Sequence, residues 1–298
     1  MPGGVVTRPR SYREATARRR VAGLLDAGTF TEWVGPGARA TSPHLAALGA
    51  PVSFDDGVVV GEGRLAGERV VVIAQEGLFN GGAVGEVHGA KIRGAFERAC
   101  AEPPRAVVFC IDSGGVRLHE ANAGLLAISE IMRAQFAAQS AGIPVWALVG
   151  GACGAFGGMG IVARLCDAVV MSEEGRLGLS GPEVIETVKG VEEFDARDRA
   201  LVWRVTGGKI RRTLGEATHL VEDDLTAFRE AVAALLSSRQ GPVPFTLETL
   251  QAAQAGLEGR AARDAAVRDG QVLWDRLGLD DAALMETAQF NRRLQELS

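Results

Sequence analysis

The chain lacks the features that would assign it to a membrane or to a nucleic acid. Its 298 residues contain no apolar run near the roughly 20 residues that a membrane-spanning helix needs. The N-terminal segment is charged and has no apolar core behind it, which argues against a secretory signal. The formal net charge is -5, whereas nucleic-acid binding usually needs a basic contact face. We therefore expect a cytoplasmic protein that binds neither a membrane nor a nucleic acid.

Cysteine and histidine are scarce, and neither shows the spacing of a metal site. No C-x-x-C pair and no H-E-x-x-H motif occurs, which argues against a zinc ribbon, a disulfide framework and a metalloprotease, so we expect no metal. G-x-S-x-G is also missing, which disfavours a serine hydrolase. The cysteines are interpreted as buried free thiols, with Cys153 the one candidate nucleophile because it lies in a glycine-rich turn. The cysteines are Cys100, Cys110, Cys153 and Cys166.

Glycine is abundant where two apolar strand-like runs end. The segment 145–149 leads into a turn rich in glycine and then into a run with helical period, and 106–112 leads into Ser113-Gly114-Gly115. Such turns let a ligand approach backbone N–H groups, and a helix that starts there adds the positive end of its dipole. Glycine in such a turn can also serve only to pack a helix on a strand. Because the pattern occurs twice, we favour a binding site for a polarised oxygen.

The rest of the chain alternates strands with helices, which predicts a mostly parallel α/β architecture in the order β-β-α-β-α-β-α-β. A disordered arm (1–11) and an irregular segment (29–54) flank a first helix whose Arg18, Arg19 and Arg20 are interpreted as a solvated face. The predicted strands are 57–64, 69–76, 107–112, 145–149 and 168–171, with a hairpin turn at 65–68. The predicted helices are 12–27, 83–101, 118–141, 225–238 and several within 246–298.

Three readings of the glycine turns differ in chemistry. A dinucleotide site is disfavoured, since the pattern Gly158-x-Gly160-x-x-Ala163 begins nine residues beyond Val149 and the acidic residue expected further on comes early. A serine hydrolase is disfavoured, since residues 154–160 of the second turn contain no serine or threonine. The remaining reading is backbone catalysis, in which N–H groups of both turns stabilise an oxyanion such as a thioester enolate. No base is obvious, which favours loss or transfer of CO2 over proton abstraction.

Several long phrases resemble one family. FNGGAVGEVHGAKI (79–92), DSGGVRLHEANAGL (112–125), VGGACGAFGGMG (149–160) and GRLGLSGPEVIE (175–186) are similar to the crotonase-like carboxyltransferases. Within this group the chain closely resembles the β-subunit family of biotin-independent malonate decarboxylases, over roughly residues 42–228. The resemblance implies an α/β, crotonase-like (ClpP/crotonase) fold of repeated ββα units with a helical C-terminal extension. The expected division is an N-terminal arm and helix (1–28), a carboxyltransferase N-half domain (29–240) and the extension (241–298).

The resemblance also implies a reaction and its partners. A β subunit paired with a γ subunit would decarboxylate malonyl thioester on an acyl carrier protein to acetyl thioester and CO2. An acyl carrier protein transferase subunit would complete the system. The chain itself would bind no cofactor, because the substrate arrives on a prosthetic group of the carrier that derives from dephospho-CoA. By position, Gly114, Gly115 and Val116 would form one side of the oxyanion hole. The other side would be Ala155, Phe156, Gly157 and Gly158.

Some details stay open. His119 is a candidate for substrate binding or proton handling, and Lys209, Arg211 and Arg212 are candidates for contact with the carrier, although such a basic run is usually a solvated face. The alternatives are a carboxyltransferase subunit of a biotin-dependent acyl-CoA carboxylase and a non-catalytic scaffold. Acetyl-CoA carboxylase β subunits are disfavoured, because they carry a four-cysteine zinc finger and this chain has no cysteine before Cys100.

Overall fold

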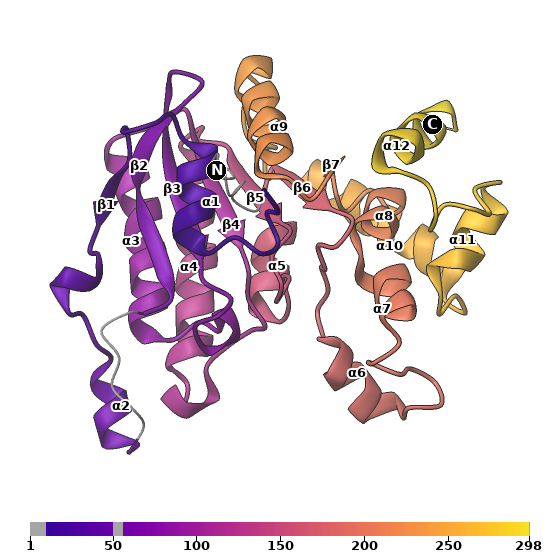
Figure 1. The fold of residues 1–298 in the computed structure, drawn as a ribbon, viewed down its shortest axis with the longest axis horizontal. Helices are drawn as coiled ribbons and strands as arrows, with labels where there is room; N and C mark the ends of the chain where they lie inside the picture. Colours follow the sequence, from indigo (N-terminus) through magenta and orange to yellow (C-terminus); the bar gives the residue numbers. More distant parts are fainter. Residues whose placement is uncertain (1–9, 50–55, 298) are drawn as a thin grey trace, which may run out of the picture.

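A computed structural model describes residues 10–49 and 56–297. One seven-stranded sheet forms the centre of this part of the chain, with its strands in sequence order across the sheet (Figure 1). The strands are β1 (Thr31–Trp33), β2 (Val58–Leu65), β3 (Glu68–Gln75), β4 (Ala106–Ile111), β5 (Val145–Val149), β6 (Ala168–Ser172) and β7 (His219–Val221). The pairs β1–β2 and β2–β3 are antiparallel, and the pairs from β3 to β7 are parallel. The predicted α/β class is confirmed.

Helices surround the sheet and extend the chain beyond it. The helices before β7 are α1 (Ala17–Leu24), α2 (Pro43–Ala47), α3 (Glu86–Ala101), α4 (Ala123–Ser140), α5 (Gly158–Arg164), α6 (Pro182–Lys189), α7 (Arg199–Thr206) and α8 (Gly208–Thr213). Those after it are α9 (Leu225–Ser238), α10 (Leu247–Asp264), α11 (Gly270–Arg276) and α12 (Thr287–Glu296). Short 3-10 turns are η1 (Pro36–Ala38), η2 (Asn80–Gly82) and η3 (Leu118–Glu120). In the described ranges, no helix is both long and apolar enough to cross a bilayer.

Two hydrophobic layers hold the helices on the sheet. All six residues of β4 and all five of β5 are buried, as expected for strands that are covered on both faces. Ile73, Phe109 and their neighbours on one face pack with α3, α4 and α5. On the other face, Val72 and Val108 pack with α1 and α9. Alternate side chains of each strand thus enter different layers, which is the period-two geometry of a pleated strand.

The repeated unit is visible in the segments that follow the central strands. After β4 and β5, Ser113 pairs with Ala155 in a parallel bridge, and Ala155 pairs with Leu177, which follows β6. Each unit therefore has one long strand, a single-bridge second strand and a helix. The predicted element order holds from β2 to β6, and the hairpin turn lies where it was expected, with Leu65 paired to Glu68. Sequence reasoning missed β1 and β7, because three residues are too short for a periodic signal.

The N-terminal helix differs from its prediction. It begins at Ala17 rather than at Tyr12, and Thr16 caps it by accepting the N–H of Arg19. Arg20 is 1% exposed, so its interpretation as part of a solvated face is wrong. The helix packs on one face of the sheet, and Arg20 lies on its buried side. Residues 1–9 of the predicted arm lie outside the described residues.

The C-terminal segment after α9 is helical, as predicted. Trp274 of α11 and Phe290 of α12 are buried in the same hydrophobic layer as α8 and β7. The 18 residues of α10, by contrast, contain no buried side chain. The predicted boundary at residue 240 stays a prediction.

Candidate functional site

The first glycine turn leaves β4 at Ile111 and runs through Asp112 to Val116. Gly115 has φ +134°, a conformation that side chains with a Cβ rarely adopt. The hydroxyl of Ser113 accepts the N–H of Gly115 at 3.2 Å, and Gly114 donates its N–H to Gly81 O at 2.9 Å. The turn is therefore held by its own serine and by the loop after β3.

The second glycine turn leaves β5 at Val149 and ends where α5 begins. Gly157 has φ +57° and ψ -136° and precedes Gly158, the first residue of that helix. Cys153 lies in the middle of this turn, half-buried, and its thiol donates to Gly77 O at 3.4 Å. Burial and then the neighbouring Asp112 carboxylate raise the pKa of Cys153 to about 11. The thiol is therefore protonated near neutral pH, which disfavours Cys153 as a nucleophile.

The two turns lie against each other. Ser113 donates its N–H to Gly154 O at 2.7 Å, and Phe156 donates its N–H to Ser113 O at 3.0 Å. A Cβ placed on Gly157 would lie 3.4 Å from the Cα of Gly115. Backbone atoms of both turns thus meet at the carboxyl ends of β4 and β5, the edge where ligands bind in parallel α/β sheets.

Most of the predicted oxyanion-hole donors are used by the fold. Five of the seven N–H groups have acceptors within the protein, at 2.8 to 3.2 Å. They belong to Gly114, Gly115, Ala155, Phe156 and Gly157. The N–H groups of the other two, Val116 and Gly158, have no acceptor among the described residues. Among the predicted residues, the structure therefore leaves one donor on each turn without an acceptor, and the role of all seven residues stays a prediction.

A buried ion pair lies beneath the turns. Asp112 and Arg20 are 2% and 1% exposed, and their side chains are 2.8 Å apart. The other oxygen of the Asp112 carboxylate accepts the N–H of Cys153 at 2.7 Å. Sequence reasoning missed this pair, since Arg20 lies in a run of three arginines that is indistinguishable from a solvated face.

A second buried polar network supports the first turn from the other side. Arg117 donates to Glu120 at 3.0 Å, to Ala83 O and to Asp56 O, and all its contacts are buried or half-buried. His88 lies against the same carbonyl of Asp56, with its Nδ1 2.9 Å away. Burial, and then the charge of Arg117, lowers the pKa of His88 to about 3. His88 is therefore neutral near neutral pH and is part of the buried network.

The predicted substrate and carrier residues are scattered. His119 is exposed in η3, directly after the first turn. Lys209 is 4% exposed and is paired with Glu173 at 2.9 Å, and Arg211 is paired with Glu216 at 2.6 Å. Arg212 is half-buried at the end of α8. Their contact with a carrier stays a prediction, although Lys209 and Arg211 are already engaged within the chain.

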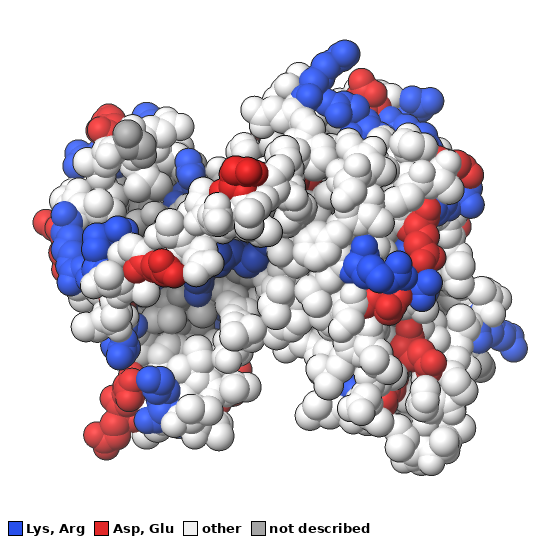
Figure 2. Space-filling view, turned by 180° about the vertical axis from the view of Figure 1, so that it is seen from behind, with Lys and Arg blue, Asp and Glu red and all other residues white. Residues whose placement is uncertain are grey.

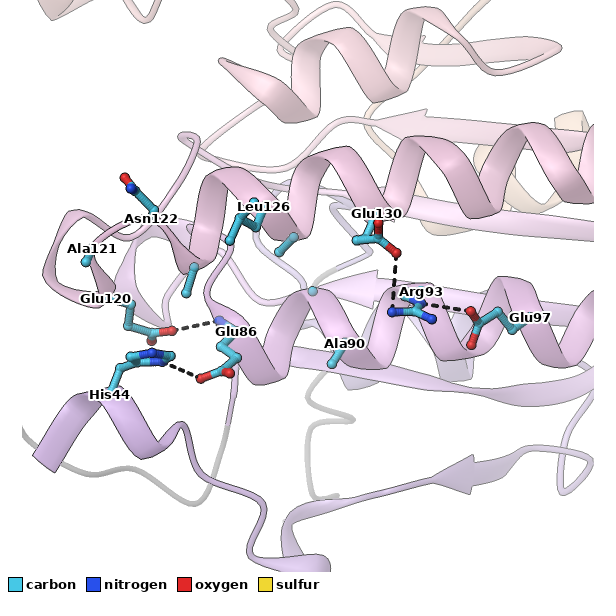
Figure 3. A pocket seen from close by; sticks show the side chains of 13 residues that line it. His44, Glu86, Ala90, Arg93, Glu97, Glu120, Ala121, Asn122, Leu126 and Glu130 are labelled. Carbon is cyan, nitrogen blue, oxygen red and sulfur yellow. Dashed lines mark hydrogen bonds and ion pairs between the residues drawn. The ribbon is translucent and has the colours of Figure 1, made fainter. Parts of the chain in front are cut away.

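A cavity of about 660 Å³ opens beside the first turn, between α2, α3 and α4 (Figure 3). Several of its polar side chains contact one another: His44 lies 2.7 Å from Glu86, and Arg93 pairs with Glu130 at 3.3 Å. It contains none of the unpaired N–H donors. The glycine turns therefore remain the better candidate for the chemistry.

Several large apolar side chains are exposed around the turns. Leu78, Leu118 and Leu179 follow β3, β4 and β6 at the same edge of the sheet, and they are 84%, 86% and 69% exposed. Val188 of α6 is also exposed. Seen from behind, the molecule is hollowed between two lobes, and basic side chains are visible inside the hollow (Figure 2). An exposed apolar edge around a candidate site indicates a contact surface.

Comparison with known proteins places the chain among carboxyltransferases. The family model described as carboxyl transferase domain matches residues 10–243. The chain is 46% identical over 241 residues to malonyl-S-ACP:biotin-protein carboxyltransferase of Malonomonas rubra, covering 76% of each chain. It is 35% identical to propionyl-CoA carboxylase beta chain of Saccharopolyspora erythraea, covering 62% of this chain and only 33% of that one.

A solved structure is similar over almost the whole length. In the crystal structure of a Pseudomonas malonate decarboxylase hetero-tetramer in complex with malonate, a chain with 40% identity matches 96% of this chain and 97% of its own, with a TM-score of 0.74. These similarities confirm the predicted crotonase-like fold and the resemblance to malonate decarboxylase subunits.

Proposed function

The chain belongs to the carboxyl transferase domain family, and we propose that it is the β subunit of a malonate decarboxylase. With a γ subunit, it converts malonyl thioester on an acyl carrier protein to acetyl thioester and CO2. It is thus a carbon-carbon lyase that needs a partner. The observation that carries this proposal is the contact between two glycine turns. On each of them one predicted donor, the N–H of Val116 or of Gly158, has no acceptor in the part of the chain that the structure describes.

The reaction needs donors at one oxygen. The bond between the malonyl Cα and its carboxylate carbon breaks, CO2 leaves, and the electron pair moves onto the thioester carbonyl as an enolate. N–H groups aimed at that oxygen stabilise the developing charge, and loss of one such donor typically costs about 2.7–4 kcal/mol. Protonation at Cα then yields the acetyl thioester. The bond-breaking step requires no base, which suits a site built from backbone.

Exposed leucines around the turns support the proposal of a partner subunit. Leu78, Leu118 and Leu179 are largely exposed at the edge where the donors lie, and a second subunit on this edge would exclude water from the enolate. The Pseudomonas relative is a hetero-tetramer. We infer a site at a β–γ interface, with the carrier protein and its transferase subunit as further partners.

The carrier would present the substrate on its dephospho-CoA-derived group, so the chain requires no cofactor of its own. Such a group carries phosphate, and the basic side chains in the hollow of Figure 2 suit it electrostatically. Of the four predicted contact residues, we favour His119, which lies directly after the first turn and is exposed.

A second function has specific support. The Malonomonas relative is named for transfer of the malonyl carboxyl group to a biotin protein. The same enolate forms in that reaction, but the CO2 unit moves to biotin instead of leaving. The turns serve either reaction equally, because both share the step at the thioester oxygen.

The test is CO2 release by the co-expressed β and γ subunits, with malonyl-CoA as the carrier mimic and without biotin. We expect acetyl-CoA and CO2 in equal amounts. No release without biotin, but carboxyl transfer to added biotin, would establish the second function. No turnover of malonyl-CoA under either condition would contradict both and favour a scaffold role.

A further inference from the structure

The carboxylate of Asp112 occupies the junction of three loops. A Cβ placed on Gly151, after β5, would lie 2.1 Å from its Cγ, and one on Gly77, after β3, would lie 2.5 Å from its Oδ2. Asp112 itself follows β4. Both glycines are therefore required by this one side chain, which fills the space where the three loops meet.

Arg20 holds that carboxylate in one orientation. Its Nη1 lies 2.8 Å from Oδ2 of Asp112, while its Nε donates to Tyr12 O at 3.0 Å and its Nη2 to Arg13 O at 3.3 Å. The guanidinium also lies over the Tyr12 ring, 4.8 Å from its centroid, and that ring stacks on Phe228 of α9. The guanidinium is thus fixed by two hydrogen bonds to backbone carbonyls and by the Tyr12 ring, and its Nη1 contacts the carboxylate as an ion pair without hydrogen-bond geometry.

Asp112 also contacts the second turn directly. Three hydrogen bonds join the two turns, and two of them run between backbone atoms of Ser113 and the segment 154–156. The third is the bond from the Cys153 N–H to Asp112 Oδ1 at 2.7 Å. Of the three, only this bond involves a side chain. Its donor, Cys153, precedes Gly158 in the same turn.

We propose that Arg20 and Asp112 are positioning residues that set the placement of the Gly158 N–H relative to that of Val116. This inference rests on the proposed function, because it assigns the pair to stabilisation of the enolate. A misplacement of about 1 Å can cost on the order of 10²-fold in rate. Both side chains are buried and do not reach the surface that a substrate would contact, so we expect their loss to lower kcat and to leave KM nearly unchanged.

The experiment compares two neutral double variants in the β–γ complex. Arg20→Met with Asp112→Ala removes both charges and the acceptor for Cys153, whereas Arg20→Met with Asp112→Asn keeps an oxygen acceptor. We expect the alanine variant to lose on the order of 10²-fold in kcat with KM within about threefold, and the asparagine variant to recover about tenfold of that loss. A structural role alone would not separate the two variants in kcat.

A matched control lies on the same face of the sheet. Asp26, beyond the end of α1, pairs with Arg229 of α9 at 2.5 Å and touches neither turn. Asp26→Asn with Arg229→Met therefore loosens the contact between α1 and α9, and we expect kcat within about twofold of the wild type. An equal loss of kcat in the control would overturn the inference, as would equal kcat in the alanine and asparagine variants.

Amide hydrogen exchange separates this inference from the proposed function. We expect clearly faster exchange in residues 151–158 of the alanine variant, since the Cys153 N–H loses its acceptor, and a smaller increase in the asparagine variant, whose acceptor is no longer paired with Arg20. Wild-type complex that releases no CO2 would contradict the proposed function, but exchange would still decide whether the pair holds the turn. If the alanine variant does not assemble, the asparagine variant decides: unchanged exchange and kcat relative to the wild type would overturn the inference.

Discussion

Two buried carboxylates illustrate how the same chemistry serves different ends in this molecule. Asp112 pairs with Arg20 and accepts the N–H of Cys153, so it connects a side-chain ion pair to the backbone of a turn. Glu216 pairs with arginines of three helices: Arg164 of α5, Arg211 of α8 and Arg260 of α10. The first carboxylate positions donors, and the second joins helices. The groups that a buried carboxylate contacts therefore decide its role.

The role of the glycine turns is tested most strongly by Gly157→Val. A β-branched residue cannot adopt φ +57° and ψ -136° without strain, so the start of α5 must shift and move the Gly158 N–H. We expect kcat for CO2 release by the β–γ complex to fall about 10²- to 10³-fold, equivalent to about 2.7–4 kcal/mol.

Gly142→Val is the control, because Gly142 has φ +83° and open space around its Cβ position, between α4 and β5. It should lower the melting temperature and leave kcat of the folded fraction within about twofold. Equal losses of kcat in both variants would show that strain in general, and not the turn, limits the reaction.

The role of Glu216 in joining three helices is tested by Glu216→Ala. Burial opposes ionisation, but Arg211 and Arg164 outweigh it and hold the pKa of Glu216 below its usual value. Removing the carboxylate leaves Arg211 mostly buried without its partner, while Arg164 and Arg260 can reach solvent. We expect about 2–3 kcal/mol less stability in urea unfolding, below the 3–5 kcal/mol of a fully buried pair, with kcat of the folded complex unchanged. A large loss of kcat would show that Glu216, like Asp112, affects the reaction and not only stability.

The smallest expected effect concerns pH and the network beside the first turn. His88 has a pKa of about 3 in the fold against 6.5 as its ordinary value. Below pH 6.5 the unfolded chain binds a proton that the folded chain does not, so the free energy of unfolding falls as the pH drops towards 3. Between pH 7 and 5 we expect a loss of about 1–2 kcal/mol from this group.

His88→Gln should flatten that pH dependence, measured as urea unfolding at several pH values, whereas His119→Gln, on an exposed histidine, should not. An unchanged slope in His88→Gln would mean that other groups govern the acid sensitivity.

Prediction from the sequence succeeded where the signal is local. The helix 225–238 and the strand 145–149 were predicted with the bounds that the structure shows, because each combines a clear hydrophobic period with flanking polar, glycine or proline residues. The strands β1 and β7 were missed, since their pairing depends on neighbours rather than on their own three residues. Arg20 was misread because charge alone does not reveal burial.

The sequence by itself determined the alternation of strands and helices, the two strand-to-glycine turns and, through its matched phrases, the family. These are encoded locally, in hydrophobic period and in the conformational freedom of glycine. Only the tertiary structure decided which N–H groups remain unpaired, that Lys209 and Arg211 are engaged inside the chain, and that Arg20 lies beneath the turns. Hydrogen bonds and ion pairs join atoms far apart in sequence, and in the low dielectric of the interior they determine which polar groups can be buried.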